Sequence, residues 1–238
     1  MYMRKEQFGV DSIIHVYNRG NRKQKIVIDD NDRWHFLQIL FYFNDEFSPV
    51  NPFRTLRELL KFDFSSKLIW PDEWPERNKL VNIVGFSLKD NHFHLIIQEI
   101  KEGGTTKFMR KFGTGMTNYF NTKYKERGKL FQGSYKARLV DTDNYLKYLS
   151  VYVQVKNVIE MYSGGLENAI LNFDHAYQFA IDYKYGSLGS QILQNLETDK
   201  ILDNHILVDL FKSGEYKKFS KECLTFVIFD EKKSQLVY

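Results

Sequence analysis

The segment that most constrains the fold is an apolar run, Gly85–Glu99, interrupted only at Lys89–Asn91. Apolar residues on both sides of a turn-forming cluster are typical of two strands joined as a hairpin. Successive strand residues face opposite ways, so His92 and His94 lie on one face and Phe93 on the other. Two imidazoles about 6–7 Å apart along a strand can share one divalent metal ion. A metal ion held there could polarise a phosphate.

The composition indicates a folded globular protein. The 238 residues include 20 Phe and 15 Tyr but only 14 Gly and 4 Pro, which argues against disorder. Cys223 is the single cysteine, which excludes an intramolecular disulfide and a cysteine zinc cage and fits a reducing cytoplasm. The chain has no apolar run of about 18 residues and no signal-peptide core. We therefore expect a cytoplasmic protein without a membrane span.

The charge is unevenly distributed along the chain. Residues 101–138 contain ten Lys and Arg against two Glu, a balance of +8. Residues 139–238 contain ten Lys against fourteen Asp and Glu, a balance of −4. The basic stretch is either a local binding site for a polyanion or a solvated helix face.

The periodicity predicts an α+β fold. We expect strands at residues 12–18, 80–88, 92–99 and 134–140, and helices at residues 29–43, 107–125 and 144–154. The N-cap of the first helix is expected within Asp29–Asp32. The caps of the second helix are expected at Thr105 or Thr106 and at Gly128, and that of the third at Asp141–Asp143. This order, β-α-β-β-(α)-β-α, is that of a ferredoxin-like α/β sandwich with an antiparallel sheet.

Two segments lie outside this core. Residues 44–78 contain prolines and one short helical pattern at 54–60, and are interpreted as an insertion of unknown role. Residues 161–238 are predicted to form a mostly helical C-terminal extension that ends in a β-rich segment, Leu224–Phe229. We therefore divide the chain into a domain of residues 1–160 and an extension.

Four motifs occur in order: Tyr17–Arg22, Asp90–Leu95, Lys129–Arg138 and Asn144–Val153. Together they resemble the single-tyrosine transposases of the HUH superfamily, and in particular their REP-associated branch, over about residues 8–160. The His-x-His pattern alone is a weak signal. Its coincidence with three further motifs at plausible spacing is specific.

The resemblance implies single-stranded DNA cleavage and rejoining. In that family a tyrosine attacks the scissile phosphate and leaves a 5′-phosphotyrosine link and a free 3′-hydroxyl. Two histidines, here His92 and His94, hold Mg²⁺ or Mn²⁺ together with a polar side chain from the tyrosine helix. The expected partner is single-stranded or hairpin DNA, and relatives include monomers and dimers that exchange tyrosine helices.

The family pattern assigns the nucleophile to Tyr152, with Tyr148 one turn earlier as the alternative. Both could instead be core residues, since aromatic side chains at this spacing usually pack. The third metal ligand of the family lies four residues after the tyrosine, where this chain has Lys156, and a protonated lysine cannot bind a metal ion. Gln154 and Asn157 are nearby but rotated away on an ideal helix; Asn157 reaches the metal only if the helix frays or ends there.

Several polar and basic residues are candidates for DNA contacts. The loop after the first strand supplies Asn18, Arg19, Asn21 and Arg22; the basic helix and its exit supply Arg110, Lys111 and Lys129; the last strand supplies Lys136 and Arg138. Such groups bind phosphates, which predicts steep salt dependence. A solvated turn is the alternative for the first group.

Three other functions compete with a DNA nickase. The same scaffold could bind structured DNA without cleaving it, because Lys156 impairs the ligand set. A ferredoxin-like RNA-binding domain would need exposed aromatic residues on its central strands, where this chain has histidines. A metal-dependent hydrolase is disfavoured because no carboxylate cluster accompanies the histidine pair.

Overall fold

The core is one antiparallel sheet of four strands in the order β2-β3-β1-β4, as expected for a ferredoxin-like sandwich. The strands are β1 (Ile13–Arg19), β2 (Val81–Lys89), β3 (His92–Glu99) and β4 (Lys136–Val140). This computed structural model describes residues 8–60, 67–193, 195–203, 205–212 and 214–235, with side chains as far as residue 226. The predicted strands and their pairing are confirmed, with ends shifted by one or two residues.

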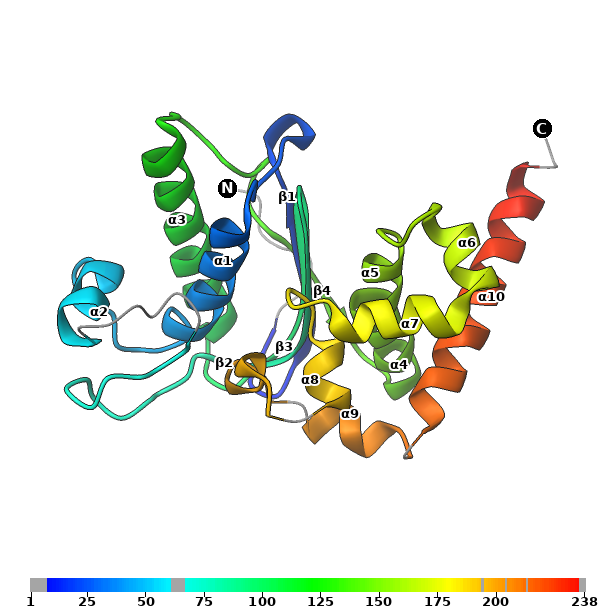
Figure 1. The fold of residues 1–238 in the computed structure, drawn as a ribbon. Coiled ribbons are helices and arrows are strands. Elements are labelled where there is room, and N and C mark those ends of the chain that lie inside the picture. Colours follow the sequence, from blue (N-terminus) through cyan, green and yellow to red (C-terminus); the bar gives the residue numbers. More distant parts are fainter. Residues whose placement is uncertain (1–7, 61–66, 194, 204, 213, 236–238) are drawn as a thin grey trace.

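One face of the sheet is covered by α1 (Asp30–Tyr42) and α3 (Gly104–Tyr124), as Figure 1 shows. Alternate residues of the central strands, Ile14, Val16, Phe93 and Leu95, point into this layer and are fully buried. The strand alternation read from the sequence therefore separates an apolar face from the histidine face.

The start of α1 is fixed by a buried carboxylate. Asp29 caps the helix in a reciprocal capping box with Asp32, as predicted. Asp32 is fully buried and accepts hydrogen bonds from the hydroxyls of Tyr119 and Tyr124 and from the ammonium of Lys123. These bonds tie the first turn of α1 to the end of α3.

Both predicted caps of α3 are wrong. The helix begins at Gly104, so Thr105 and Thr106 lie inside it. The reason is that the carboxylate of Glu99 accepts the backbone N–H groups of Gly103 and Thr105 and takes the place of a side-chain cap. The helix ends at Lys125, which adopts the left-handed conformation with φ 55°, so Gly128 lies beyond the end.

The insertion forms α2 (Pro52–Leu60) beside α1 and α3. The short helix expected at 54–60 is confirmed, and residues 61–66 lie outside the described residues. The end of α1 and α3 approach closely because Gly115 has no side chain: a Cβ there would lie 2.4 Å from the ring of Phe43.

The opposite face of the sheet is covered by a helix that changes type. It consists of α4 (Asp143–Val151), a π-helical turn η2 (Tyr152–Lys156) and α5 (Asn157–Ile159), after an N-cap at Thr142. The predicted helix and its cap segment are confirmed, but the helix continues five residues beyond Gln154 through a π-turn that periodicity did not reveal.

The described part of the C-terminal extension consists of helices joined by turns, with isolated β-bridges to β2 at Gly186 and Leu202. Its elements are α6 (Gly165–Leu171), α7 (Phe173–Asp182), α8 (Leu188–Ile192), η3 (Glu197–Lys200), α9 (His205–Leu210) and α10 (Glu215–Gln235). The expected β-rich ending at Leu224–Phe229 is wrong, because this segment continues α10. Tyr216, Ser220 and Leu224 recur every four residues and are buried, which is a helical pattern. Among the described residues, no helix is long and apolar enough to cross a membrane.

The extension covers the free edge of the sheet as well as the helix that carries Tyr152. The backbone N–H groups of Ser187 and Asp203 donate to carbonyls of β2, at 3.0 and 2.8 Å. Side chains of α7, α8 and α10 share one apolar cluster with Val151, Val155 and Val158. The edge strand is therefore paired rather than exposed, and η2 is held between the sheet and the extension.

Candidate active site

The histidine face of the sheet holds a compact aromatic cluster. Tyr17 on β1 lies directly opposite His94 on β3, with ring centroids 5.5 Å apart. His15, two residues before Tyr17 on β1, stacks on His94 with ring centroids 5.2 Å apart. The ring of His92 lies 5.3 Å from that of His94. The expected common face of His92 and His94 is thus present, and His15 joins it as a buried residue.

Hydrogen bonds on one side of each imidazole leave the other nitrogen for a ligand. Nδ1 of His94 lies 2.9 Å from Nε2 of His15, and Nδ1 of His92 lies 2.7 Å from Oδ1 of Asn91. Burial lowers the pKa of His94 to about 2 and that of His92 to about 4. Both rings are therefore neutral near pH 7, the form in which imidazole binds metal ions.

Tyr152, and not Tyr148, faces the histidines. The ring of Tyr152 meets His94 edge-on at 5.3 Å and His15 at 6.2 Å. Its side chain is 38% exposed, so one part contacts the histidines and another reaches solvent. Tyr148 is 58% exposed and packs on Phe219 of α10 at 5.3 Å. This arrangement supports Tyr152 as the candidate nucleophile.

Lys156 lies beside Tyr152 within an ion-pair network. Its ammonium is 5.6 Å from the centre of the Tyr152 ring and 2.5 Å from Glu160, which also binds Lys89 at 2.7 Å. Burial raises the pKa of Tyr152, and the positive charge of Lys156 opposes that rise. Lys156 is therefore placed to favour the phenolate.

The π-turn changes which polar residue faces the sheet. The backbone N–H of Asn157 donates to the carbonyl of Tyr152, five residues earlier. This hydrogen bond spans one residue more than the bond of an α-helix. Asn157 is buried, and its amide lies 3.4 Å from Oγ of Ser87, the residue directly opposite His94. The π-turn therefore brings Asn157 to the histidine face of the sheet without the fraying or ending of the helix that an ideal α-helix would require.

Gln154 is turned in the opposite direction, into the extension. Its amide nitrogen donates to Ser187 at 2.9 Å, and its oxygen accepts from the hydroxyl of Tyr216 at 2.9 Å. Both bonds are buried. Gln154 therefore acts as a link between η2 and the extension, a role that sequence reasoning missed because its partners lie 33 and 62 residues away.

A pocket of about 520 Å³ opens beside the histidines. Its lining consists of Tyr17, Asn18, Arg19, His92, His94, Gln132, Gly133, Ser134 and Lys136. Asn18 donates to the carbonyl of Gly133 at 3.0 Å, so the end of β1 and the loop before β4 form one wall. The expected position of Asn18 and Arg19 in a loop is wrong, because both pair with β3 and belong to β1. The pocket combines two imidazoles with cationic side chains, a chemistry suited to a phosphate.

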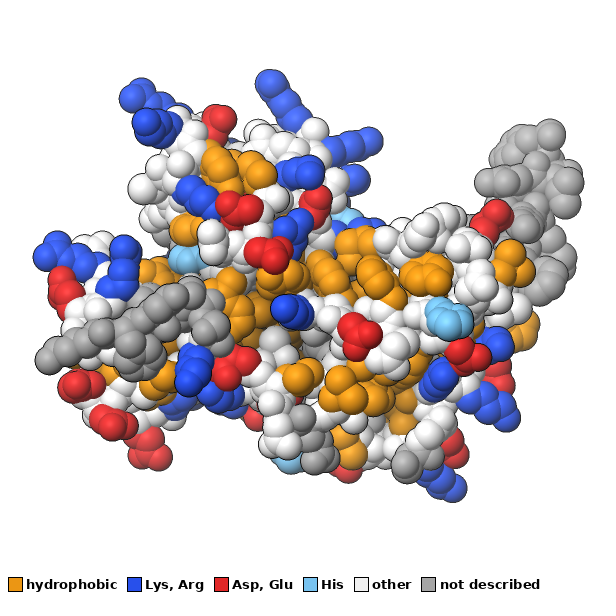
Figure 2. Space-filling model, viewed as in Figure 1, with side chains coloured by type: hydrophobic (Ala, Val, Ile, Leu, Met, Phe, Trp, Pro, Cys, Tyr) orange, Lys and Arg blue, Asp and Glu red, His pale blue; other side chains and the backbone are white. Residues whose placement is uncertain are grey.

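The other predicted DNA-contact residues fall into two groups. Arg138 lies opposite His15 on β4, and Asn21 donates its backbone N–H to Leu130, next to Lys129. Arg22 follows in the same turn, and Figure 2 shows Lys and Arg side chains over this end of the molecule. Arg110 and Lys111 lie instead on α3, on the other side of the sheet.

The donor set fits a divalent ion with two imidazole ligands. The Nε2 atoms of His92 and His94 would supply two nitrogen donors, and the amide of Asn157 lies 3.4 Å from Oγ of Ser87, the residue paired with His94. Among the described residues, no three His, Cys, Asp or Glu side chains form a metal-binding group.

Comparison with known proteins agrees with the motifs. Residues 73–156, a span that includes His92, His94 and Tyr152, match the family model of IS200-like transposases. The resemblance to single-tyrosine transposases is thereby confirmed for that segment, and it supports a transposase-like function in DNA processing. No curated protein sequence matches the chain. A solved REP-associated tyrosine transposase bound to a REP hairpin is similar, at 8% identity and a TM-score of 0.48, over 82% of this chain and 88% of that one.

Proposed function

We propose that this chain is a metal-dependent endonuclease and strand transferase for hairpin-forming single-stranded DNA, with Tyr152 as its nucleophile. The observation that carries the proposal is the contact of Tyr152 with His94 beside a cationic pocket. Tyr152 is partly exposed and contacts a pair of histidines suited to metal binding, a position that packing alone does not explain. Mg²⁺ or Mn²⁺ is the proposed cofactor, held by His92 and His94 with Asn157 as third ligand.

The chemical step is an in-line displacement at phosphorus. The phenolate oxygen of Tyr152 forms a bond to the scissile phosphorus while the bond from phosphorus to the 3′-oxygen breaks. The 3′-oxygen takes up a proton, and the 5′-phosphate stays linked to the enzyme. Attack by a 3′-hydroxyl on this link reverses the step and joins strands, so no nucleoside triphosphate is consumed.

The residues around Tyr152 supply charge rather than further covalent chemistry. Lys156 favours the ionised phenol, whose ordinary pKa near 10 makes it a weak nucleophile. Arg19 and Lys136 line the pocket and would bind the phosphates that flank the scissile bond. A bound divalent ion would neutralise charge on the phosphate oxygens.

The recognised substrate is proposed to be folded DNA with an unpaired flank. The similar solved transposase is bound to a REP hairpin. In this chain the η1 turn (Asn21–Lys23), the segment around Lys129 and β4 expose basic side chains at the same end as the pocket. Contacts of this kind position a backbone and weaken steeply with salt.

A binding protein without nuclease activity is the second candidate. The specific observation in its favour is the position of Lys156, a cation next to the proposed metal site that forms ion pairs with Glu160. If its charge excludes the metal ion, DNA binding would remain and cleavage would be lost.

The test is capture of the covalent intermediate. Labelled hairpin single strands from the DNA flanking the gene are incubated with the protein and Mn²⁺, then separated on a denaturing gel. Tyr152→Phe, Tyr148→Phe and His94→Ala are run alongside. A protein-linked band that disappears in Tyr152→Phe and His94→Ala but persists in Tyr148→Phe is the expected result.

Loss of the band only in Tyr148→Phe would keep the mechanism and overturn the assignment of the nucleophile. Absence of any band, with tight and salt-sensitive DNA binding, would overturn the nuclease and favour the binding protein.

A further inference from the structure

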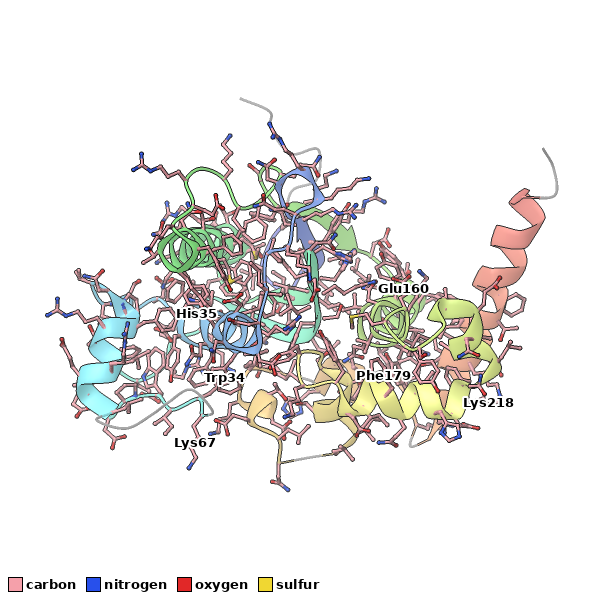
Figure 3. All side chains as sticks on the ribbon, turned by 45° about the horizontal axis from the view of Figure 1, so that its top comes forward. Trp34, His35, Lys67, Glu160, Phe179 and Lys218 are labelled. Atoms are coloured by element: carbon pink, nitrogen blue, oxygen red, sulfur yellow. The ribbon has the colours of Figure 1, made fainter. Side chains whose placement is uncertain are left out.

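A second and larger cavity, of about 1060 Å³, lies between α1, α2 and α3. Figure 3 places His35 of α1 between α2 and α3, with Glu160 across the sheet from it. The cavity is therefore on the side of the sheet opposite the histidine pair and is not part of the proposed active site. Its volume is in the range of sites that hold small organic ligands.

The wall contributed by α3 is polar and follows the helical repeat. Lys111, Thr114, Asn118 and Thr122 line the cavity at spacings of three and four residues, so they form one stripe along the helix. Lys111, the cation of this stripe, belongs to the basic stretch of residues 101–138 noted in the sequence. It faces the insertion, whose role the sequence did not reveal.

The lining has the charge of a site for an anion. Arg54, Arg57, Lys111 and Lys123 line the cavity. Arg54 is paired with Glu58, and Lys123 is paired with Asp29 and Asp32. Arg57 is exposed, and its Nε donates to the carbonyl of Phe53 at 3.1 Å. Arg57 and Lys111 form no ion pair with a described carboxylate, so these two cations favour a negatively charged occupant.

The lining is also aromatic. Trp34, His35, Phe53 and Tyr119 contribute to the wall. His35 stacks on Tyr119 with ring centroids 3.7 Å apart and lies 4.3 Å from the ring of Phe53. Aromatic faces beside cations are the features that bind unpaired nucleotides, whose bases are planar and whose phosphates are anionic. An acidic peptide would use the cations but not the aromatic wall.

His35 provides an independent indication that a polar ligand belongs here. Its side chain is only 7% exposed, and its buried Nε2 has no hydrogen-bond partner among the described residues. An unsatisfied buried nitrogen costs about 1–3 kcal/mol, so such groups usually have a partner. A base edge in the cavity would supply one after a small side-chain adjustment.

We propose that this cavity binds a nucleotide, with its base against the aromatic wall and its phosphate at Arg57 and Lys111. The source is either a free mononucleotide or one nucleotide of a DNA strand. The cavity ends at Thr122 and Lys123, beside the exposed basic residues that follow α3, so a strand held there could extend into it. The proposal goes beyond the function proposed above and does not depend on cleavage by Tyr152.

The test is calorimetric titration of the full chain with dAMP, dGMP, dCMP and dTMP, and with short single-stranded oligonucleotides. Asn118→Trp fills the cavity from an exposed helix position, and Arg57→Glu reverses the charge of its rim. Lys218→Glu is the control, because Lys218 is an exposed cation on α10 outside the cavity. Tyr152→Phe is titrated in parallel, and unfolding curves establish that each variant is folded.

We expect both cavity variants to weaken mononucleotide binding by about tenfold or more, equivalent to about 1.4 kcal/mol, while Lys218→Glu and Tyr152→Phe leave it unchanged. Weakened binding of oligonucleotides, with no binding of mononucleotides by any form, would also support the site and identify a DNA strand as the source. Unchanged affinity for both kinds of ligand in folded Asn118→Trp and Arg57→Glu would overturn the proposal, whatever the outcome of the covalent-adduct experiment.

Discussion

Nε2 of His15 lies 2.9 Å from Nδ1 of His94, and both rings are buried. One nitrogen donates and the other accepts, so the bond fixes the orientation of the His94 ring relative to β1. The nitrogen of His94 that remains for a ligand is Nε2. Partners of this kind orient metal-binding histidines and raise their affinity.

His15→Phe should therefore weaken metal binding without removing a ligand. Phenylalanine keeps the ring packing against Tyr17 but cannot bond to His94. We expect the affinity for Mn²⁺ to fall by about 10–100-fold, measured by electron paramagnetic resonance of free Mn²⁺ in the absence of DNA. His175→Phe, at an exposed position on α7, is the control. Equal affinities of the wild-type protein and His15→Phe would show that His15 only packs.

Removal of the charge at position 156 should shift the pH dependence of cleavage. Lys156 opposes the rise that burial causes in the pKa of Tyr152, so Lys156→Met raises that pKa further. A larger share of the phenol is then protonated at neutral pH. We expect adduct formation to slow severalfold there and to recover at higher pH.

The measurement is the rate of covalent adduct formation as a function of pH, for the wild-type protein and for both single variants. Lys89→Met is the matched control because it also frees one oxygen of Glu160 but leaves Lys156 beside Tyr152. A pH profile of Lys156→Met that coincides with that of the wild-type protein would contradict the assigned role.

The bond between Tyr216 and Gln154 should contribute to stability. Tyr216→Phe removes a buried hydroxyl that donates to Gln154 at 2.9 Å and leaves the amide oxygen without that donor. We expect the free energy of unfolding in urea to fall by about 1–3 kcal/mol. Tyr177→Phe is the control, since its buried hydroxyl has no partner among the described residues, and its loss should be neutral or stabilising. A neutral Tyr216→Phe would mean that this link to the extension is energetically irrelevant.

The sequence predicted those features that depend on local periodicity. Strand alternation was sufficient to place His92 and His94 on one face, and the capping residues Asp29 and Thr142 lay in the predicted segments. The features that failed depend on distant contacts. The start of α3 is set by the carboxylate of Glu99 in the preceding strand, which competes with local cap preference.

The same reason explains what was missed at the candidate site. The π-turn after Tyr152 is held between the sheet and an extension whose position no local pattern predicts. The apolar run Leu224–Phe229 suits a buried strand as well as a helix. In α10 Leu224 is buried in the apolar cluster of the extension, whereas Phe226 is 74% exposed. The insertion gave no functional signal because its cavity forms only against α1 and α3.

The buried His35 should make the fold sensitive to mild acid. Burial lowers the pKa of His35 from the ordinary 6.5 to about 3. Between these values the unfolded chain takes up a proton that the folded chain excludes, so the contribution of His35 is full above pH 6.5 and declines as the pH falls toward 3. The slope approaches about 1.4 kcal/mol per pH unit.

His35→Phe removes this proton uptake and keeps a ring against Tyr119. His15, His92 and His94 are the same in both proteins, so their contributions cancel in the comparison. Urea unfolding from about pH 7 to about pH 5 should show the wild-type protein losing about 1–2 kcal/mol relative to His35→Phe. The exposed His175→Phe should follow the wild-type curve. Parallel curves for His35→Phe and the wild-type protein would mean that His35 is protonated in the fold, which would require a partner for its Nε2.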